Sequence, residues 1–260
     1  FAKKGERNWI KIANNQEIGA YFDLQNGVVG TTDVGFTTNI ENYGNGWYKC
    51  SLSSNRAVSA TESLIAYTSV DGTSTSYTGD GTSGVYIYGG SLELGSYPTS
   101  YIPTNGEVAG VTRNQDIFTR DGIGSLINST EGVLFLEMAA LSNDGTHRRV
   151  SLSDGTNSNR IVIAYDTADK IQIFIIGAPA GSFTPNLVID ITLNSKIAVS
   201  WSSTEARLYV NGSPILVTSG DFSYTASTLT ELKSEDGGGG NNFFGKVKQL
   251  QVYDTALTDE

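Results

Sequence analysis

The sequence predicts an all-β protein built from two β-sandwich domains in tandem. Apolar and polar residues alternate with a period of two in many short stretches, as expected of strands with one buried face. Turn-forming residues separate these stretches at intervals of roughly eight to fifteen residues, which is typical of sandwiches. Glycine is abundant, at 30 of 260 residues, and long runs of helix-forming residues are missing. No amphipathic helix is therefore expected.

Strands are expected throughout the first half of the chain. The stretch "EIGAYFDLQNG" alternates and then closes with an Asn-Gly turn, and "SLIAYTSVDG" alternates and closes with an Asp-Gly turn. The residues expected to share a face are Ile18, Ala20, Phe22 and Leu24 in the first stretch, and Leu64, Ala66 and Val70 in the second. The stretch "GVYIYGGSLELG" carries apolar or aromatic residues on both faces, which predicts a central strand.

The second half of the chain follows the same pattern. The stretch "EGVLFLEMAAL" is apolar on both faces and predicts a central strand, while "RRVSLSDG" and "NRIVIAYD" predict strands on either side of a polar loop. Two further alternating stretches predict inward faces made of Leu187, Ile189, Ile191 and Leu193, and of Ile197, Val199 and Trp201. A hairpin is expected in "ARLYVNGSPI", through Asn211-Gly212.

The last strand, "FFGKVKQLQVYD", contains a break in its alternation. Leu250 and Val252 share one parity, whereas Val247 has the other. One extra residue would bring all three side chains to the same face, so we predict a β-bulge near Lys248-Gln249. A short turn is expected at "TALTDE".

The stretch "SLELGSYPTSYIPT" indicates the end of the first domain. Proline cannot donate to a sheet, so Pro98 and Pro103 are expected to end a sheet edge, with Tyr97 and Tyr101 holding the exit of the chain. The predicted domains are 1–104, a sandwich that is incomplete at its N-terminus, a linker at 105–115, and a second sandwich at 116–260.

Net charge and composition exclude several classes of partner. A net charge of −10 and a pI near 4.6 argue against nucleic acid and against an anionic membrane surface. No stretch is long and apolar enough for a membrane span, and no signal peptide opens the chain, which we expect to begin within a longer protein. Cys50 is the only cysteine, so it cannot form an internal disulfide and is expected to act as a small hydrophobe.

The sequence contains no recognisable catalytic motif. Retaining glycosidases need two carboxylates about 5 to 5.5 Å apart, but Glu137 stands alone on its strand and Asp190 has only Val188 and Thr192 beside it. His147, the only histidine, lies in a loop that enters a strand. The glycine-rich "EDGGGGNN" lacks the residues of a phosphate-binding loop and is interpreted as a flexible hairpin loop. We therefore expect no catalytic residues and no enzyme activity.

Candidate ligand sites are defined by residue type alone. No metal ligands are assigned and no cofactor is expected. Calcium binding remains an alternative, because Asp71, Asp80 and Asp154 lie in glycine-rich loops and carry the oxygen ligands that calcium prefers. Aromatic rings stack on the apolar faces of sugars, so the three tryptophans are candidates for a sugar platform. Trp201 is expected in the core, Trp9 against the second domain, and Trp47 either in the core or at the surface.

The first half of the chain resembles a known family. The pieces "GVYIYG", "LELG" and "PTSYIPT" occur in order, and with "GNGWYKCSLS" they resemble tail-fibre and head-fibre (head-spike) virion proteins of tailed bacteriophages, over about residues 1–115. The resemblance implies a domain similar to a carbohydrate-binding module, a location on the phage particle, and assembly as a homotrimer.

The second half is similar to concanavalin A-like (laminin G-type) jelly rolls. The similarity rests on "EGVLFLEM", "KIAVSWSSTEARLYVNG" and the closing "FFGKVKQLQVYDTALTDE". The Trp-His pair that this family often carries before the strand of Trp201 is replaced by "LNSKIAVSW". The leading hypothesis is a non-enzymatic fibre or spike protein that adheres to host-surface glycans. The alternatives are a glycan-cleaving enzyme or its accessory module, and a purely structural decoration that contacts other virion proteins.

Overall fold

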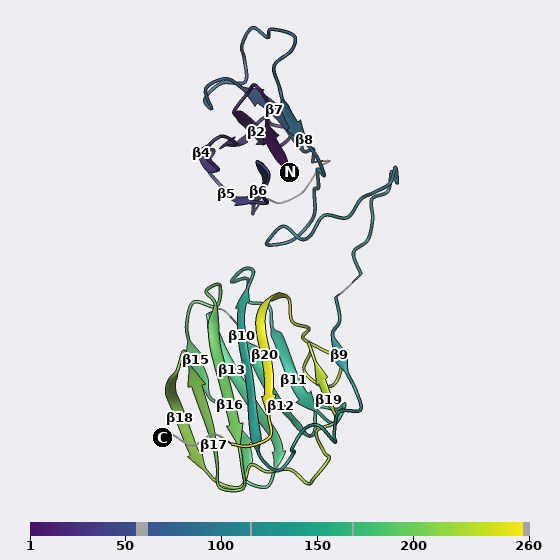
Figure 1. Ribbon diagram of the computed structural model, residues 1–260, viewed down its shortest axis with the longest axis vertical. Helices are drawn as coiled ribbons and strands as arrows, with labels where there is room; N and C mark the ends of the chain where they lie inside the picture. The colour runs from purple at the N-terminus through teal and green to yellow at the C-terminus, as the bar shows by residue number, and fades with distance from the viewer. Residues whose placement is uncertain (56–61, 115, 168, 257–260) are drawn as a thin grey trace. The chain divides into compact units, whose positions relative to one another are not determined.

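The computed structural model describes residues 1–55, 62–114, 116–167 and 169–256. The chain divides into two compact units, Phe1–Asn114 and Gln115–Glu260 (Figure 1). Within the described ranges every residue in regular secondary structure lies in a strand, so no helix suited to crossing a membrane occurs there. The predicted all-β class, with sandwiches in tandem, is confirmed.

The first unit is a sandwich of two four-stranded antiparallel sheets. One sheet has the order β5-β6-β1-β8, made of β5 (Phe36–Asn42), β6 (Trp47–Ser54), β1 (Ala2–Lys4) and β8 (Val85–Ile87). The other has the order β4-β3-β2-β7, made of β4 (Val28–Thr32), β3 (Gly19–Asp23), β2 (Trp9–Ala13) and β7 (Ile65–Ser69). A small core between them draws on both sheets, including Ile10 and Phe22 from one and Ala2 from the other.

The second unit is a larger sandwich with a five-stranded and a seven-stranded sheet, whose long strands run side by side in Figure 1. The five-stranded sheet has the order β18-β17-β16-β10-β20, made of β18 (Ser213–Ser219), β17 (Glu205–Val210), β16 (Ser195–Trp201), β10 (Gly132–Ala140) and β20 (Gly245–Tyr253). The seven-stranded sheet has the order β14-β13-β12-β11-β19-β9 with β15 also paired to β13, made of β14 (Gly181–Phe183), β13 (Lys170–Ala178), β12 (Arg160–Tyr165), β11 (Arg148–Ser153), β19 (Glu231–Lys233), β9 (Thr119–Arg120) and β15 (Asn186–Val188). Alternate residues of both sheets fill one continuous core.

Most of the predicted elements are present. Ile197, Val199 and Trp201 are fully buried on one face of β16, and β10 pairs on both sides, as expected of a central strand. Asn211 and Gly212 both have positive φ and connect β17 to β18, which is the backbone conformation that an Asn-Gly hairpin turn requires.

The predicted bulge in β20 is confirmed. Glu137 pairs with Gln249 and Met138 pairs with Val247, so Lys248 is the extra residue. The shift places Val247, Leu250 and Val252 opposite Met138, Leu136 and Leu134, which alternate on the inner face of β10.

Two predictions about strands in the first unit are wrong. Residues 85–95 form no central strand, because β8 is only three residues long, pairs with β1 alone and lies at a sheet edge. The prolines do not end that edge either, since β8 stops at Ile87 and Pro98 lies in a segment without strands. The face predicted for Leu64, Ala66 and Val70 agrees with the register at Ala66, which pairs with Ile12, although this face is exposed because β7 is an edge strand.

Two predictions in the second unit are also wrong. The alternating stretch 187–193 is a strand only up to Val188, and a turn at Asp190 leaves Leu193 exposed while Ile191 remains buried. The glycine-rich stretch 235–242 is no hairpin loop, because β19 before it and β20 after it belong to different sheets.

The segments between and after the units are short of regular structure. Residues 105–114 of the predicted linker form no strand and group with the first unit. Of the two tyrosines expected to hold the exit, Tyr101 contacts Tyr88 at 5.5 Å between ring centroids. The predicted turn at "TALTDE" lies largely outside the described residues.

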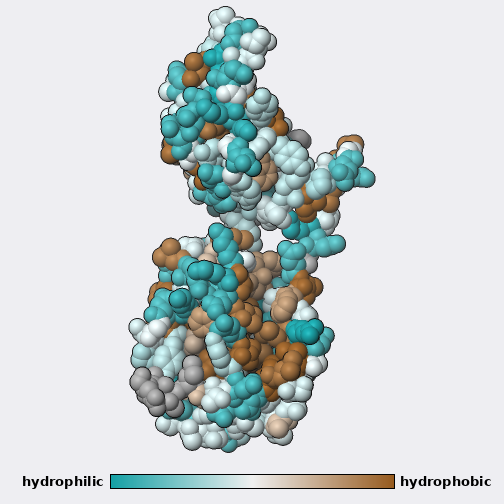
Figure 2. Space-filling model, viewed as in Figure 1, coloured by the Kyte–Doolittle hydropathy of each residue, from teal (hydrophilic) through white to brown (hydrophobic). Residues whose placement is uncertain are grey.

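The surfaces of both units mix polar and apolar side chains (Figure 2). In this view hydrophobic residues gather over the part of the second unit that lies toward β9 and β19. The exposed apolar residues next to β9 in the chain include Ile117 and Phe118. The acidic composition therefore does not make the surface uniformly polar.

Candidate functional site

A tight hairpin loop between β5 and β6 brings aromatic side chains together in the first unit. The loop reads "YGNG", and Gly44, Asn45 and Gly46 all have positive φ. Asn42 Oδ1 accepts a hydrogen bond from the Gly44 amide at 2.7 Å, and the chain closes where the Tyr43 amide donates to the Trp47 carbonyl. Glycine and asparagine adopt this left-handed conformation at little cost, so the sequence fixes the turn.

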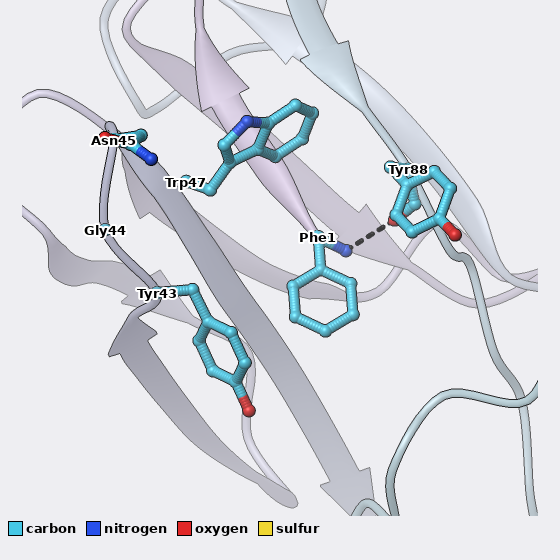
Figure 3. A pocket seen from close by; sticks show the side chains of 6 residues that line it. All are labelled: Phe1, Tyr43, Gly44, Asn45, Trp47 and Tyr88. Carbon is cyan, nitrogen blue, oxygen red and sulfur yellow. Dashed lines mark hydrogen bonds between the residues drawn. The ribbon is translucent and has the colours of Figure 1, made fainter.

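Together with Phe1, just before β1, and Tyr88, just after β8, this hairpin forms a shallow cavity of about 300 Å³. It is lined by Phe1, Tyr43, Gly44, Asn45, Trp47 and Tyr88 (Figure 3). The Phe1 ring lies between those of Tyr43 and Tyr88, with centroid distances of 5.1 and 6.4 Å. Tyr43 and Tyr88 are 56% and 62% exposed, so their rings remain available to a ligand. We call this set of residues the aromatic pocket.

Polar groups at the edge of the aromatic pocket are free to bind a ligand. The Asn45 side chain is exposed and forms no hydrogen bond within the described part of the chain. Sites that bind small molecules typically have walls of aromatic and apolar side chains and a few polar groups. Such a site can stack the apolar face of a sugar and bind its hydroxyls at the rim.

The three candidate tryptophans occupy different environments. Trp201 is fully buried in the second core, as predicted. Trp47 lines the aromatic pocket, which decides between the two positions left open for it. Trp9 packs against Gly30 and Gly72 within the first unit, where its ring atoms would lie within 2.8 Å of a Cβ added to either glycine.

The acids considered for catalysis have protein partners. Glu137 is buried and accepts hydrogen bonds from Lys248 at 2.8 Å and from Asn194. The hydrogen bond from Lys248 is the main reason that the pKa of Glu137 lies below its usual value. Asp190 Oδ1 accepts from the amide and hydroxyl of Thr192, which lowers its pKa. Both carboxyls are therefore ionised at neutral pH.

His147 is partly exposed just before β11, where its Nδ1 lies against Asp166 Oδ1. Its position at the entry to a strand agrees with the sequence prediction.

Lowered carboxyl pKa values predict acid-sensitive stability of the second unit. Burial alone would raise the pKa of Asp144, but hydrogen bonds from Thr146, Ser142 and Arg148 bring it well below its usual value. A carboxyl with a lower pKa in the folded state stabilises the fold above its unfolded pKa of about 4 and loses that contribution as pH falls. We therefore expect the urea midpoint to fall steadily from pH 5 to pH 3.

Asp144→Asn is the control for this prediction. The variant should be less stable at pH 7, and its stability should depend less on pH between 5 and 3. A urea midpoint of the wild type that stays constant or rises over this range would contradict the prediction.

The acidic loops considered for calcium are organised as turns. Asp71 Oδ1 accepts from the Thr73 and Ser74 amides, and Asp80 binds the Thr82 and Ser83 amides and Arg7. Asp154 in the second unit likewise binds Thr156 and Asn159. Across the described ranges no group of three or more His, Cys, Asp or Glu residues is positioned to hold a metal ion.

Cys50 packs against the first core and is partly buried, as predicted. Burial raises the pKa of its thiol to about 12, so the thiol stays protonated and unreactive at neutral pH.

A second cavity, of about 540 Å³, lies in the second unit and is lined by Asn143, Asp169, Val188, Ile189, Asp190 and Thr192. No aromatic ring lines it, and Asp190 is already bound by Thr192. The aromatic pocket is therefore the better candidate for a sugar site.

Sequence reasoning found only one residue of the aromatic pocket, Trp47. Phe1, Tyr43 and Tyr88 come from three segments far apart in the chain, and only the pairing of β1 with β6 and β8 brings them together. The signal present in the sequence is "NYGNGW", a tight turn with an aromatic residue on either side.

A family comparison covers most of the second unit. Residues 138–260 match the family model described as the concanavalin A-like lectin/glucanases superfamily. The match agrees with the two packed sheets of the second unit, which is therefore similar to concanavalin A-like jelly rolls over the described part of this range. None of the curated proteins that were compared matches the chain.

Similar solved structures include carbohydrate-binding proteins. The CBM40 domain of the Ruminococcus gnavus IT-sialidase, bound to α2,3-sialyllactose, is 14% identical, covers 52% of this chain and 81% of its own, and has a TM-score of 0.43. The leech intramolecular trans-sialidase is 17% identical over 52% of this chain and 23% of its own, with a TM-score of 0.44. Sheep galectin-11 is 11% identical over 55% of this chain and 99% of its own, with a TM-score of 0.34. Likenesses this distant carry no inference about ligand or activity.

Proposed function

We propose that this chain is a non-enzymatic fibre or spike protein of a phage particle that adheres to host-surface glycans through the aromatic pocket. The observation that carries the proposal is the aromatic pocket itself, in which rings from three segments surround a cavity with a free amide at its rim. The location on the particle surface rests on the resemblance of about residues 1–115 to fibre proteins of tailed bacteriophages.

The pocket suits a sugar better than a charged or purely apolar ligand. The exposed faces of Tyr43 and Tyr88 offer stacking surfaces, and no lysine, arginine or carboxylate lines the cavity. Each stacking contact contributes about 0.5–1.5 kcal/mol, so a single pocket binds weakly. Assembly into a homotrimer, which the fibre resemblance implies, would multiply the avidity.

The state of the acids supports a role without catalysis. Glycoside hydrolysis requires one carboxyl with a raised pKa that donates a proton. The two acids considered from the sequence, Glu137 and Asp190, both have lowered pKa values and bind neighbouring side chains. Neither is poised as a general acid.

Titration of the purified chain with neutral oligosaccharides from a glycan array tests the proposal. We expect Tyr43→Ala and Tyr88→Ala each to weaken binding about three- to tenfold, because each removes one stacking ring. Tyr86→Ala is the matched control, since Tyr86 is an exposed tyrosine of the same unit that does not line the pocket.

Loss of affinity in the Tyr86 variant equal to that in the other two, or absence of any saccharide binding, would refute the proposed site. A reducing-end assay on every bound saccharide tests the second part of the proposal, and release of new reducing ends would show an enzyme instead. Detection of the chain in purified virions tests the location.

A further inference from the structure

The outer face of the seven-stranded sheet in the second unit carries a cluster of polar and aromatic side chains. The inner residues of β11, β12 and β13 fill the core. On the outer face the register places Ser151, Val162 and Phe174 in one row, and Arg149 and Arg160 belong to the rows on either side of it. Both guanidinium groups lie over the Phe174 ring, at 4.9 and 6.0 Å from its centroid.

The glycine-rich connection between β19 and β20 is fixed beside this face by hydrogen bonds. Asp236 Oδ1 accepts from the amides of Gly238 and Gly240, and its Oδ2 accepts from Asn241 Nδ2. Arg160 Nη1 donates to the Asp236 carbonyl at 2.7 Å and also to Asn157. Arg160 is therefore committed to holding the connection in place.

Arg149, by contrast, has no hydrogen bond from its guanidinium group to the described residues. Its side chain is only 13% exposed, and the nearest carboxylate oxygen, Asp236 Oδ2, lies 3.9 Å away. Both carboxylate oxygens of Asp236 already accept hydrogen bonds, Oδ2 from Asn241 and Oδ1 from the amides of Gly238 and Gly240. The neighbouring Arg148 shows the usual arrangement, in which Nη1 and Nη2 donate to Thr146 and Asp144.

The Nη groups of Arg149 are the donors left without a hydrogen-bond acceptor in the described structure. A buried Nε without a partner does not distinguish Arg149, because Arg148 and Arg160 share it. A buried donor without an acceptor costs about 1–3 kcal/mol, and more when it is charged. Burial lowers the pKa of Arg149, Asp236 opposes that effect, and the like charge of Arg160 adds to it.

We propose that Arg149, whose guanidinium group lies over the Phe174 ring, binds the carboxylate of an acidic sugar on the outer face of the seven-stranded sheet. A guanidinium fork matches a carboxylate, which accepts two parallel hydrogen bonds from it. The nearby negative charge of Asp236 favours a singly charged carboxylate over a doubly charged phosphate. This inference rests on the proposed glycan binding and adds that the glycan carries carboxyl groups.

The test is calorimetric titration of the whole chain with trigalacturonate, galactotriose and acetate. We expect Arg149→Met to weaken trigalacturonate binding about tenfold or more, because it removes charged hydrogen bonds but keeps the apolar stem. Arg149→Lys should recover only part of the affinity, because an ammonium group cannot form the fork. Arg120→Ala, an exposed arginine on β9 of the same sheet, should bind like the wild type.

Unchanged trigalacturonate binding in Arg149→Met, with a wild-type urea midpoint, would overturn the assignment. Acetate that competes at the same concentration as trigalacturonate would overturn the acidic-sugar part, whereas weak competition supports it. Galactotriose should depend on Tyr43 and not on Arg149, so failure of the carboxylate site remains distinguishable from failure of the aromatic pocket.

Discussion

Replacing Trp201 by alanine is expected to lower the free energy of unfolding of the second unit by about 3–5 kcal/mol. The indole is fully buried, and its Nε1 donates to the Ser129 carbonyl at 3.3 Å. Its cross-strand neighbours are Gly132 on β10 and Ala206 on β17, two small residues that leave room for the ring. Truncation therefore leaves a cavity that the surrounding strands cannot readily fill.

Differential scanning calorimetry and urea denaturation followed by circular dichroism would measure this loss. Trp201→Phe retains most of the ring but loses the hydrogen bond, so it should cost clearly less than alanine. Gly132→Ala tests the same contact from the other side, because a Cβ there would lie 2.7 Å from the indole and 2.5 Å from the Tyr253 carbonyl. If the alanine variant of Trp201 unfolds at the wild-type midpoint, the indole is not essential to this core.

Local sequence signals predicted the elements whose register depends on local chemistry. The alternation of Ile197, Val199 and Trp201, the Asn211-Gly212 turn and the bulge at Lys248 are each determined within a few residues of chain. The bulge could be found because a single residue out of phase moves every later side chain to the other face.

Position within a sheet could not be predicted in the same way. Residues 85–87 are apolar on both faces, which suits a central strand, yet they form an edge strand because no further strand of the described chain pairs with them. The stretch 187–193 alternates throughout, but the turn that Asp190 stabilises through Thr192 ends its strand early. Alternation reports which side chains share a face of a strand, and not which strands pair or which face becomes buried.

The functional sites were harder to predict than the fold, for a similar reason. Trp47 was a candidate by residue type, but two of the rings beside it, Phe1 and Tyr88, flank β1 and β8, which lie far from it in the sequence. Arg149 gave no signal in the sequence, because it lacks a hydrogen bond only where Asp236, 3.9 Å away, binds the 236–241 connection instead. The residues of such sites lie on different strands. They come together only when strands far apart in the sequence pair, and local sequence patterns do not show which strands pair.

Replacing Asp236 by alanine is expected to destabilise the second unit by about 2–4 kcal/mol. The side chain is buried and accepts three hydrogen bonds from Gly238, Gly240 and Asn241, so its removal leaves those donors unsatisfied. It also removes the negative charge closest to Arg149. Asp236→Asn is the matched variant, because its amide oxygen can still accept from the glycines while the charge is lost, and its cost should be smaller.

A double-mutant cycle with Arg149→Met separates the charge of Asp236 from its hydrogen bonds. If the carboxylate also stabilises the guanidinium across 3.9 Å, Asp236→Ala should cost about 1 kcal/mol less in the Met background than in the wild type. Equal costs in the two backgrounds would mean that Asp236 serves the connection alone and that Arg149 draws nothing from it. In that case the guanidinium charge would be even less compensated within the chain. A measured coupling would instead give the part of that charge that Asp236 compensates, and an incoming carboxylate would neutralise the rest.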